Sequence, residues 1–192
     1  ADHEAFAALE QAVDQALGQI RDKGAILVPF ELPEAGGIKD IFSTMLPSDL
    51  LATLGRDYYL KERDNIDPVT AARLDMAANI PAPQYISLVR RYHRLGLLGA
   101  AHLKGLDGFL SPTTPLLPMP VADCLTPEAA GSFTARSLQN TRPGNAYNLC
   151  AASIPLQNSG LPVGLQLHCP AGHESRLLEI CMALEKALAG RS

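Results

Sequence analysis

The chain has 192 residues, of which 47% are hydrophobic and 19% are charged. A chain of this size buries roughly 70% of its unfolded surface, so its composition excludes intrinsic disorder. The net charge is −4, and the densest basic cluster is the short run Arg90–Arg94, which excludes the footprint of a nucleic-acid-binding protein. The apolar stretches are broken by glycine and fall below the roughly 20 residues that cross a bilayer. We therefore expect one soluble domain over 1–192 with no nucleic-acid or membrane partner.

Four cysteines, Cys124, Cys150, Cys169 and Cys181, are widely spaced and include no C-x-x-C pair. This spacing predicts reduced, mostly buried thiols and a cytoplasmic protein. The first residues show no basic region followed by an apolar run, so no secretory signal is visible. The chain has no initiator methionine and opens directly on a helical pattern, so we expect a portion of a longer protein.

The first half of the chain predicts helices with one strand between them. Apolar residues at steps of three and four predict an amphipathic helix over 2–22. The apolar run 25–30 follows a Lys-Gly helix stop and predicts a strand buried on both faces. Ser48 and Asp67 are candidate N-caps for helices that run to Arg63 and Asn79. A helix followed by a buried strand indicates an α/β fold.

The middle of the chain predicts a long helix, a strand and a loop. Residues 84–104 have helical periodicity, weakened by Gly96 and Gly99. Residues 106–111 predict a strand that enters a proline-rich segment, where neither a helix nor a central strand can continue. The polar stretch 121–142 has poor periodicity and predicts a loop of the length that often carries function.

The last fifty residues predict a short helix, a hairpin and a long helix. Residues 144–150 predict the short helix, and the apolar runs 152–156 and 161–168 flank Gln-Asn-Ser-Gly and predict a β-hairpin. Residues 174–189 place apolar side chains on one face and predict an amphipathic helix. Helices and apolar runs thus alternate along the whole chain.

Common catalytic fingerprints are absent from the sequence. It contains no G-x-S-x-G nucleophile turn, no phosphate-binding G-x-x-x-x-G-K-[ST] loop and no G-x-G-x-x-G. The nearest metal-like group is His168, Cys169, His173 and Glu174. If a strand continues through His168 and Cys169, they point to opposite faces and do not converge, so a capped strand-to-helix turn is the favoured interpretation.

Several polar residues have a functional and an ordinary interpretation. The cluster Arg90–Arg94 either binds an anion or forms a solvated helix face, and Asp107 is either a catalytic carboxylate or a turn former. Arg73 either holds a substrate carboxylate or pairs with Asp75 and neighbouring residues. A surface pair is the favoured interpretation of Arg73 from spacing alone.

Hydroxyl and amide residues mark two further candidate segments. Ser111, Thr113 and Thr114 follow a predicted strand, where α/β proteins place ligands, although such residues are also common in loops. The segment 135–145 is rich in hydrogen-bonding side chains, which either contact a ligand or form turns. Its members are Arg136, Asn140, Thr141, Arg142 and Asn145.

The sequence resembles the C-terminal part of the amidase signature family. The residues that carry this resemblance are Asn145, Ala151–Pro155, Gly160–Leu167, Glu174, Leu177, Leu178 and Leu184-Glu185, with support from Asp107–Pro115 and from Leu17, Gly24-Ala25 and Val28. The sequence departs from the family at Asn148 and Cys150, where many members have glycine and proline. We therefore assign no subfamily.

The resemblance implies a mixed sheet with helices on its faces and an enzyme that hydrolyses carboxamide C–N bonds. Members use a Ser, cis-Ser and Lys triad on a Gly- and Ser-rich segment in the N-terminal half of their chains, and no such segment is present here. The resemblance thus implies no catalytic residue in this chain, and no metal or cofactor. It places Arg73, Thr141 and Asn145 among substrate-binding residues.

Two functions follow from the sequence. The first is the C-terminal part of an amide hydrolase that is inactive without its other half and acts on a small-molecule amide. The second is a non-catalytic binding or assembly subunit derived from the same fold. In either case the surface that the first half of family members covers is expected to be open and to favour self-association.

Overall fold

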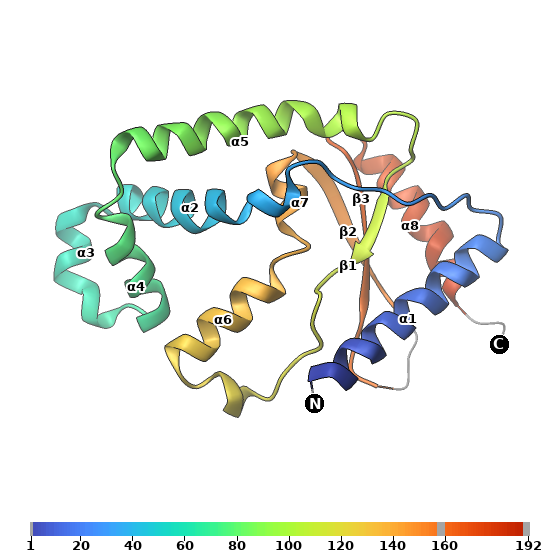
Figure 1. The fold of residues 1–192 in the computed structure, drawn as a ribbon, viewed down its shortest axis with the longest axis horizontal. Helices are drawn as coiled ribbons and strands as arrows, with labels where there is room; N and C mark the ends of the chain where they lie inside the picture. The colour runs from blue at the N-terminus through green and yellow to red at the C-terminus, as the bar shows by residue number, and fades with distance from the viewer. Residues whose placement is uncertain (1, 157–159, 190–192) are drawn as a thin grey trace.

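The computed structural model describes residues 2–156 and 160–189, which form the helices and strands of Figure 1. Its α-helices are α1 (Asp2–Asp22), α2 (Lys39–Leu54), α3 (Arg56–Glu62), α4 (Pro68–Ala77), α5 (Ala82–His102), α6 (Pro127–Ser137), α7 (Arg142–Ala146) and α8 (Glu174–Leu188). Its strands are β1 (Phe109–Pro112), β2 (Leu149–Pro155) and β3 (Gly164–Pro170). The predicted α/β class is confirmed. Among the described helices, none is long and apolar enough to cross a membrane.

The three strands form one sheet in the order β1-β3-β2, and both pairings are antiparallel. The predicted hairpin of β2 and β3 is confirmed, with Leu149 opposite Pro170 and Pro155 opposite Gly164. Part of its predicted turn, 157–159, lies outside the described residues. Strand β3 is therefore central and has a hydrogen-bonded neighbour on each side.

The core lies between the sheet and the two terminal helices. Leu165, Leu167 and Cys169 alternate along β3 and are 0–4% exposed. They pack with apolar side chains of α1 and α8, which lie on the same side of the sheet in Figure 1. Because strand side chains alternate between faces, Gln166 and His168 point to the other side.

A second apolar cluster joins the long helix to the sheet. Ile41 of α2, Leu95 of α5 and Tyr147 after α7 are each at most 1% exposed and lie in this cluster. The hydroxyl of Tyr147 donates to the Pro33 carbonyl, and its ring meets His102 edge-on at 5.8 Å. Tyr147 thus anchors α5 and the segment before α2 to the start of β2.

Glycine permits the contact between α5 and Tyr147. A Cβ at Gly99 would overlap the carbonyl oxygen of Tyr147, whereas one at Gly96 would lie 3.6 Å from the Asn148 Cβ, an ordinary contact. We expected both glycines only to weaken the helix. At Gly99 the missing side chain instead lets two backbones meet.

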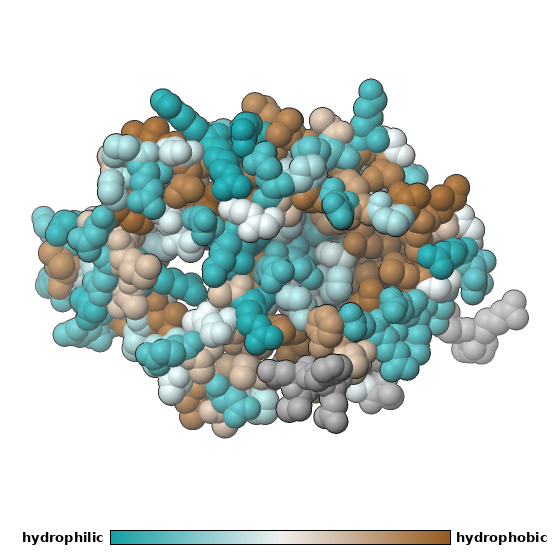
Figure 2. All heavy atoms as spheres, viewed as in Figure 1, coloured by the Kyte–Doolittle hydropathy of each residue, from teal (hydrophilic) through white to brown (hydrophobic). Residues whose placement is uncertain are grey.

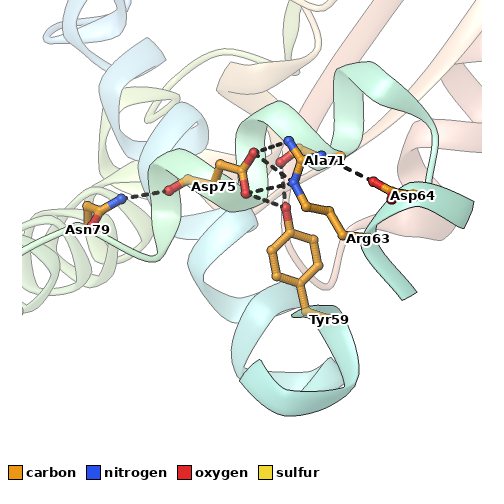
Figure 3. A network of polar contacts seen from close by, with 6 residues as sticks. All are labelled: Tyr59, Arg63, Asp64, Ala71, Asp75 and Asn79. Carbon is orange, nitrogen blue, oxygen red and sulfur yellow. Dashed lines mark hydrogen bonds and ion pairs between the residues drawn. The ribbon is translucent and has the colours of Figure 1, made fainter. Parts of the chain in front are cut away.

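A polar network fixes the helices at the far end of the molecule (Figure 3). The Tyr59 hydroxyl lies 2.7 Å from an Asp75 carboxylate oxygen and 2.9 Å from the Ala71 carbonyl oxygen. The Arg63 guanidinium donates to both oxygens of Asp75 at 2.5–3.2 Å. These bonds from Arg63, followed by the one from Tyr59, lower the pKa of Asp75. The network ties α3 and the turn after it to α4.

Three sequence predictions of secondary structure were wrong, and the short helix expected over 144–150 is only partly right, because it ends at Ala146 and β2 begins at Leu149. Residues 25–30 form no strand; Ile26 is 91% exposed, because none of the described strands pairs with this segment. The helix expected from Ser48 begins nine residues earlier and is divided by Gly55, whose φ of 81° breaks the helical path. The expected loop 121–142 contains α6, which Thr126 caps by accepting from the Ala129 N–H at 3.2 Å.

The second face of the sheet carries a buried histidine. His168 is 0% exposed, and its ring stacks on Phe109 with centroids 4.2 Å apart. Helix α7 covers it so closely that a Cβ at Gly144 would lie 3.3–3.4 Å from the imidazole. Neither ring nitrogen has a hydrogen-bond partner among the described residues. Burial lowers the pKa of His168 to about 4.

We predict that Gly99→Ala destabilises the chain by about 3 kcal/mol, because its methyl group overlaps the backbone at Tyr147. Gly96→Ala is the matched control on the same helix. Gly96→Ala should leave the free energy of unfolding unchanged or raise it by up to about 1 kcal/mol, since alanine stabilises a helix more than glycine does. Urea unfolding of both variants measures the difference. Equal stability of the two variants would contradict the close approach.

We predict that His168 makes the chain acid-sensitive. Unfolded histidine has a pKa near 6.5, so as the pH falls from 6.5 towards 4 the unfolded state binds the proton first. The contribution of His168 to the free energy of unfolding is therefore fully present above pH 6.5. The free energy of unfolding decreases by about 2 kcal/mol between there and pH 5. Urea unfolding at a series of pH values measures this loss. His168→Leu should remove it, whereas the exposed His93→Gln should not; an unchanged pH profile in His168→Leu would exclude His168 as the cause.

Candidate functional site

A row of polar side chains crosses the face of the sheet opposite the apolar core. Ser111 of β1, Gln166 of β3 and Ser153 of β2 are Cα partners across the three strands. Residues that are paired in this way point to the same face. Gln166 is only 8% exposed, and Ser153 at the edge is exposed. We call Ser111, Gln166 and Ser153 the polar row.

Two members of the polar row have unused hydrogen-bonding atoms. The Ser111 Oγ and the Gln166 Oε1 are buried and have no hydrogen-bond partner among the described residues. A buried polar atom without a partner costs about 1–3 kcal/mol. Such atoms are uncommon in folded proteins, and a ligand or a further segment of protein explains them when it supplies the partner.

One end of the polar row is fixed by a hydroxyl pair. The hydroxyl oxygens of Thr113 and Ser153 lie 2.5 Å apart, and the Thr113 N–H donates to the Gly164 carbonyl at 2.8 Å. A Cβ at Gly164 would come within 2.6 Å of both hydroxyl oxygens. Glycine is therefore required for this contact between β1 and β2 across the end of β3.

The segment between α6 and α7 lies against the same end of the sheet. Asn140 donates from its side-chain nitrogen to the Pro112 carbonyl at 2.8 Å. This bond brings the segment predicted to be functional next to Thr113 and the polar row. In the view of Figure 2, hydrophilic residues gather in the middle of the molecule, and hydrophobic residues gather towards the end that carries α1 and α8.

The structure brings together only some of the predicted strand-end residues. Ser111 and Thr113 lie together, whereas the Thr114 hydroxyl donates to the Leu116 carbonyl at 2.9 Å and forms a local turn. Gln166 and Ser153 were not predicted as site residues. The signal for Gln166 was present, because a polar residue between Leu165 and Leu167 is typical of a strand with one apolar and one polar face.

The proposed substrate-binding residues lie on α4 and around α7. Arg73 is exposed, and the alternative that it pairs with Asp75 is wrong, because Asp75 pairs with Arg63. Arg142 is partly buried; burial and then the positive charge of Arg73 lower its pKa. Arg73 and Arg142 are thus close enough to interact electrostatically.

The other two residues of this group differ in their contacts. The Thr141 hydroxyl donates to the Leu138 carbonyl at 3.1 Å, as expected for a turn. The Asn145 side chain is exposed beside Thr141 and Arg142 on the first turns of α7. The segment therefore presents amide, hydroxyl and guanidinium groups close together in the chain.

Other candidate residues have structural partners. Arg91 and Arg94 form ion pairs with Glu34 at 3.7 and 2.8 Å, which fix the segment before α2 against α5. Asp107 pairs with Arg176 at 2.9 Å. These contacts favour the ordinary interpretations of the basic cluster and of Asp107.

The metal-like group is dispersed in the fold. His168 lies buried under α7, Cys169 points into the apolar core, and His173 is exposed at the start of α8. No group of three or more His, Cys, Asp or Glu side chains able to hold a metal ion occurs within residues 2–156 and 160–189. The turn before α8 is closed by Glu174, whose carboxylate accepts from the Gly172 N–H at 3.3 Å.

Two hollows in the surface lie away from the polar row. One of about 400 Å³ lies between the end of α5 and the start of α8 and is lined by Lys104, Asp107 and Arg176, among others. One of about 260 Å³ lies beside α1 and is lined by Gln11, Gln15 and neighbouring apolar residues. Neither is lined by a member of the polar row.

Comparison with known proteins identifies the fold and the family. The model of the family named Amidase matches residues 3–178. A 2-amino-5-chloromuconic acid deaminase of Comamonas testosteroni is 32% identical over 184 residues, which are 94% of this chain and 39% of the deaminase. A subunit of the glutamyl-tRNA(Gln) amidotransferase of Methanocaldococcus jannaschii is 31% identical over 87 residues, 45% of this chain and 19% of the relative. The chain thus spans well under half the length of both relatives.

Solved structures share the fold at low sequence identity. A crystal structure of an amidase has a TM-score of 0.82 and 19% identity, with 97% of this chain and 44% of that chain covered. The allophanate hydrolase of Kluyveromyces lactis has a TM-score of 0.78 and 17% identity, with 96% of this chain and 30% of the hydrolase covered. Because the family model covers most of the chain and the deaminase is 32% identical across nearly all of it, this chain belongs to the amidase family.

Proposed function

We propose that the chain is the C-terminal part of an amidase signature enzyme that hydrolyses a carboxamide C–N bond. Its role is to complete the fold and to form one wall of the substrate pocket. Family membership supports the reaction class, and the match to only 39% of the deaminase supports a larger enzyme.

The proposed reaction is acyl transfer to a serine and then to water. The nucleophilic Ser, the cis-Ser and the Lys would lie on a segment outside these 192 residues, since the sequence holds no Gly-Gly-Ser-Ser run. The serine attacks the amide carbonyl, the lysine accepts its proton through the second serine, and backbone N–H groups stabilise the oxyanion. This chemistry requires no metal or organic cofactor.

The observation that carries the proposal is the polar row with its unused hydrogen-bonding atoms. A carboxamide has a carbonyl acceptor and N–H donors, and the hydroxyl of Ser111 and the amide of Gln166 can satisfy both. The Ser111 Oγ and the Gln166 Oε1 are buried within this chain, whereas Ser153 at the edge of the row is exposed, so we expect a substrate to approach the row from its Ser153 end.

We further propose that the substrate carries an acidic group. Arg73 lies near Arg142, and neither has an ion-pair partner among the described residues. Two unpaired arginines favour a carboxylate between them. The 32% identical relative is named for an acid, 2-amino-5-chloromuconic acid. Thr141 and Asn145 would contact the same part of the substrate.

We predict that the purified 192-residue chain does not hydrolyse amides, because it lacks a positioned nucleophile and base. Ammonia release from aliphatic, aromatic and carboxylate-bearing amides measures this, with the full-length gene product as the positive control. Turnover by the chain that is abolished in Ser111→Ala or Ser153→Ala would contradict the proposal.

In the full-length gene product, we predict that Arg73→Ala raises KM for a carboxylate-bearing amide at least about tenfold, because a charged hydrogen bond is lost. Arg73→Lys should retain part of the affinity. Arg21→Ala, an exposed arginine at the end of α1, is the matched control. A neutral amide of similar size should be affected little by Arg73→Ala. Equal losses on both substrates would contradict a carboxylate contact.

The alternative is a non-catalytic binding or assembly subunit. The reading frame upstream of the chain discriminates between the two. An in-frame Gly-Gly-Ser-Ser segment supports the hydrolase, whereas a start codon immediately before Ala1 supports the non-catalytic alternative.

A further inference from the structure

The last residue of β1 has a carbonyl that the sheet does not use. The Thr113 N–H donates to the Gly164 carbonyl at 2.8 Å, so these two residues form a hydrogen-bonded pair. Along an antiparallel ladder, such residues alternate with residues whose N–H and C=O groups point away from the neighbouring strand. Pro112, which lies opposite Leu165, is of the second kind. Its carbonyl therefore points to the outer edge of β1, where no other described strand lies.

Asn140 occupies this edge carbonyl. Its side-chain amide donates to the Pro112 carbonyl at 2.8 Å, and the bond is partly buried. Asn140 lies in the turn that connects α6 to α7. Within the described residues, no other side chain of 138–142 hydrogen-bonds to a strand. The bond from Asn140 is therefore the polar link that holds this turn to the edge of β1.

Arg142 follows Asn140 by two residues and begins α7. The turn between them is closed locally, because the Thr141 hydroxyl and the Arg142 N–H both donate to the Leu138 carbonyl, at 3.1 and 3.2 Å. A movement of Asn140 relative to β1 would therefore move Arg142 with it. The Arg142 guanidinium has no ion-pair partner among the described residues, so its place depends on the backbone that carries it.

We infer that Asn140 is a positioning residue for substrate specificity. By donating to the Pro112 carbonyl, it holds Arg142 where the guanidinium meets the acidic group of a substrate whose carboxamide lies at the polar row. The inference rests on the proposed function and deepens it, because it names a residue that sets the distance between the two ends of the binding site. Asn140 acts through Arg142 and needs no contact of its own with the substrate.

The link joins the two parts of the site directly. Ser111 of the polar row precedes Pro112 in β1, so the strand that receives the bond from Asn140 also carries a proposed carboxamide partner. Hydrogen bonds weaken steeply when distance and angle leave a narrow range, and a bond to a charged group is the stronger kind. Loss of the link should therefore weaken the contact to the acidic group and leave the contacts to the carboxamide in place.

The experiment measures kcat and KM of the full-length gene product for a carboxylate-bearing amide and for a neutral amide of similar size. Asn140→Ala should raise KM for the carboxylate-bearing amide about fivefold, the loss expected for one neutral hydrogen bond. Its kcat on either amide, and its KM for the neutral amide, should change little, because only uniform binding of the acidic group is weakened.

Two further variants separate the lost N–H from other effects. Asn140→Leu fills the side-chain volume but has no N–H, so it should behave as Asn140→Ala does. Gln139→Ala is the matched control in the same turn, because the Gln139 side chain is exposed and makes no hydrogen bond among the described residues. It should leave kcat and KM unchanged for both amides.

A double variant tests whether Asn140 acts through Arg142. Arg142→Ala alone should raise KM for the carboxylate-bearing amide at least about tenfold, because a charged hydrogen bond is lost. Adding Asn140→Ala to Arg142→Ala should raise that KM no further, since no guanidinium is left to position. Two effects that multiply would show that Asn140 acts independently and would overturn the inference.

Failure of this inference differs from failure of the proposed function. If Arg142→Ala selectively raises KM for the carboxylate-bearing amide while Asn140→Ala and Asn140→Leu do not, the positioning role is wrong and the proposed substrate stands. Equal losses on both amides in the Asn140 variants would show a general structural role and would also overturn the inference. If Arg142→Ala affects both amides alike, or the full-length gene product hydrolyses neither, the proposed function is wrong and the positioning role falls with it.

Discussion

Strand β3 is the element on which the rest of the structure depends. It is the central strand, so both edges are occupied by hydrogen bonds, and Leu165 through Cys169 are all buried. Its alternating sequence divides the sheet into an apolar face, which is covered by α1 and α8, and a polar face, which carries Gln166 and His168. Core packing and the candidate site both follow from that single register. A shift by one residue would exchange the faces and remove both features at once.

The polar face is occupied in two different ways along its length. At one end α7 presses on His168, and its tight contact at Gly144 leaves no room for a ligand. At the other end Ser111 and Gln166 keep buried atoms for which no helix among the described residues supplies a partner. The Gly99–Tyr147 contact sets this boundary, because it holds α5 and α7 at one end of the sheet only. The chain covers 39% of the 32% identical deaminase, and under the proposed function a further portion of the enzyme would lie against this end of the face.

Sequence periodicity predicted those elements whose apolar residues pack within this chain. The helices at both termini, the long helix and the hairpin have a strong apolar stripe or alternation, and all four are confirmed. The prediction of a strand at 25–30 was wrong. A strand needs a hydrogen-bonded neighbour from elsewhere in the fold, and the apolar composition of a segment does not show whether such a neighbour exists. Of the site, the hydroxyl residues at the end of β1 were predictable from position, whereas their pairing with Gln166 and Ser153 depends on register. The sequence has Asn148 where many family members have glycine. The backbone explains why asparagine is accepted there, since its φ of 51° lies in the region that glycine favours and asparagine tolerates.

Segment 25–30 touches the rest of the chain through Leu27, which packs on the apolar core, and Phe30, which stacks on Phe109, but its backbone is not part of the sheet. Between Ala25, whose N–H bonds back to Ile20, and the Pro33 carbonyl, which receives the Tyr147 hydroxyl, the described backbone amides have no hydrogen-bonded partner. Such amides exchange with solvent deuterium without any unfolding step. The amides of β3 exchange only when the whole chain unfolds. The segment is also the natural point of entry for a protease, because an extended, solvated backbone matches what protease clefts bind. Cleavage there would separate α1 from the long helices in sequence while leaving its apolar face seated against α8.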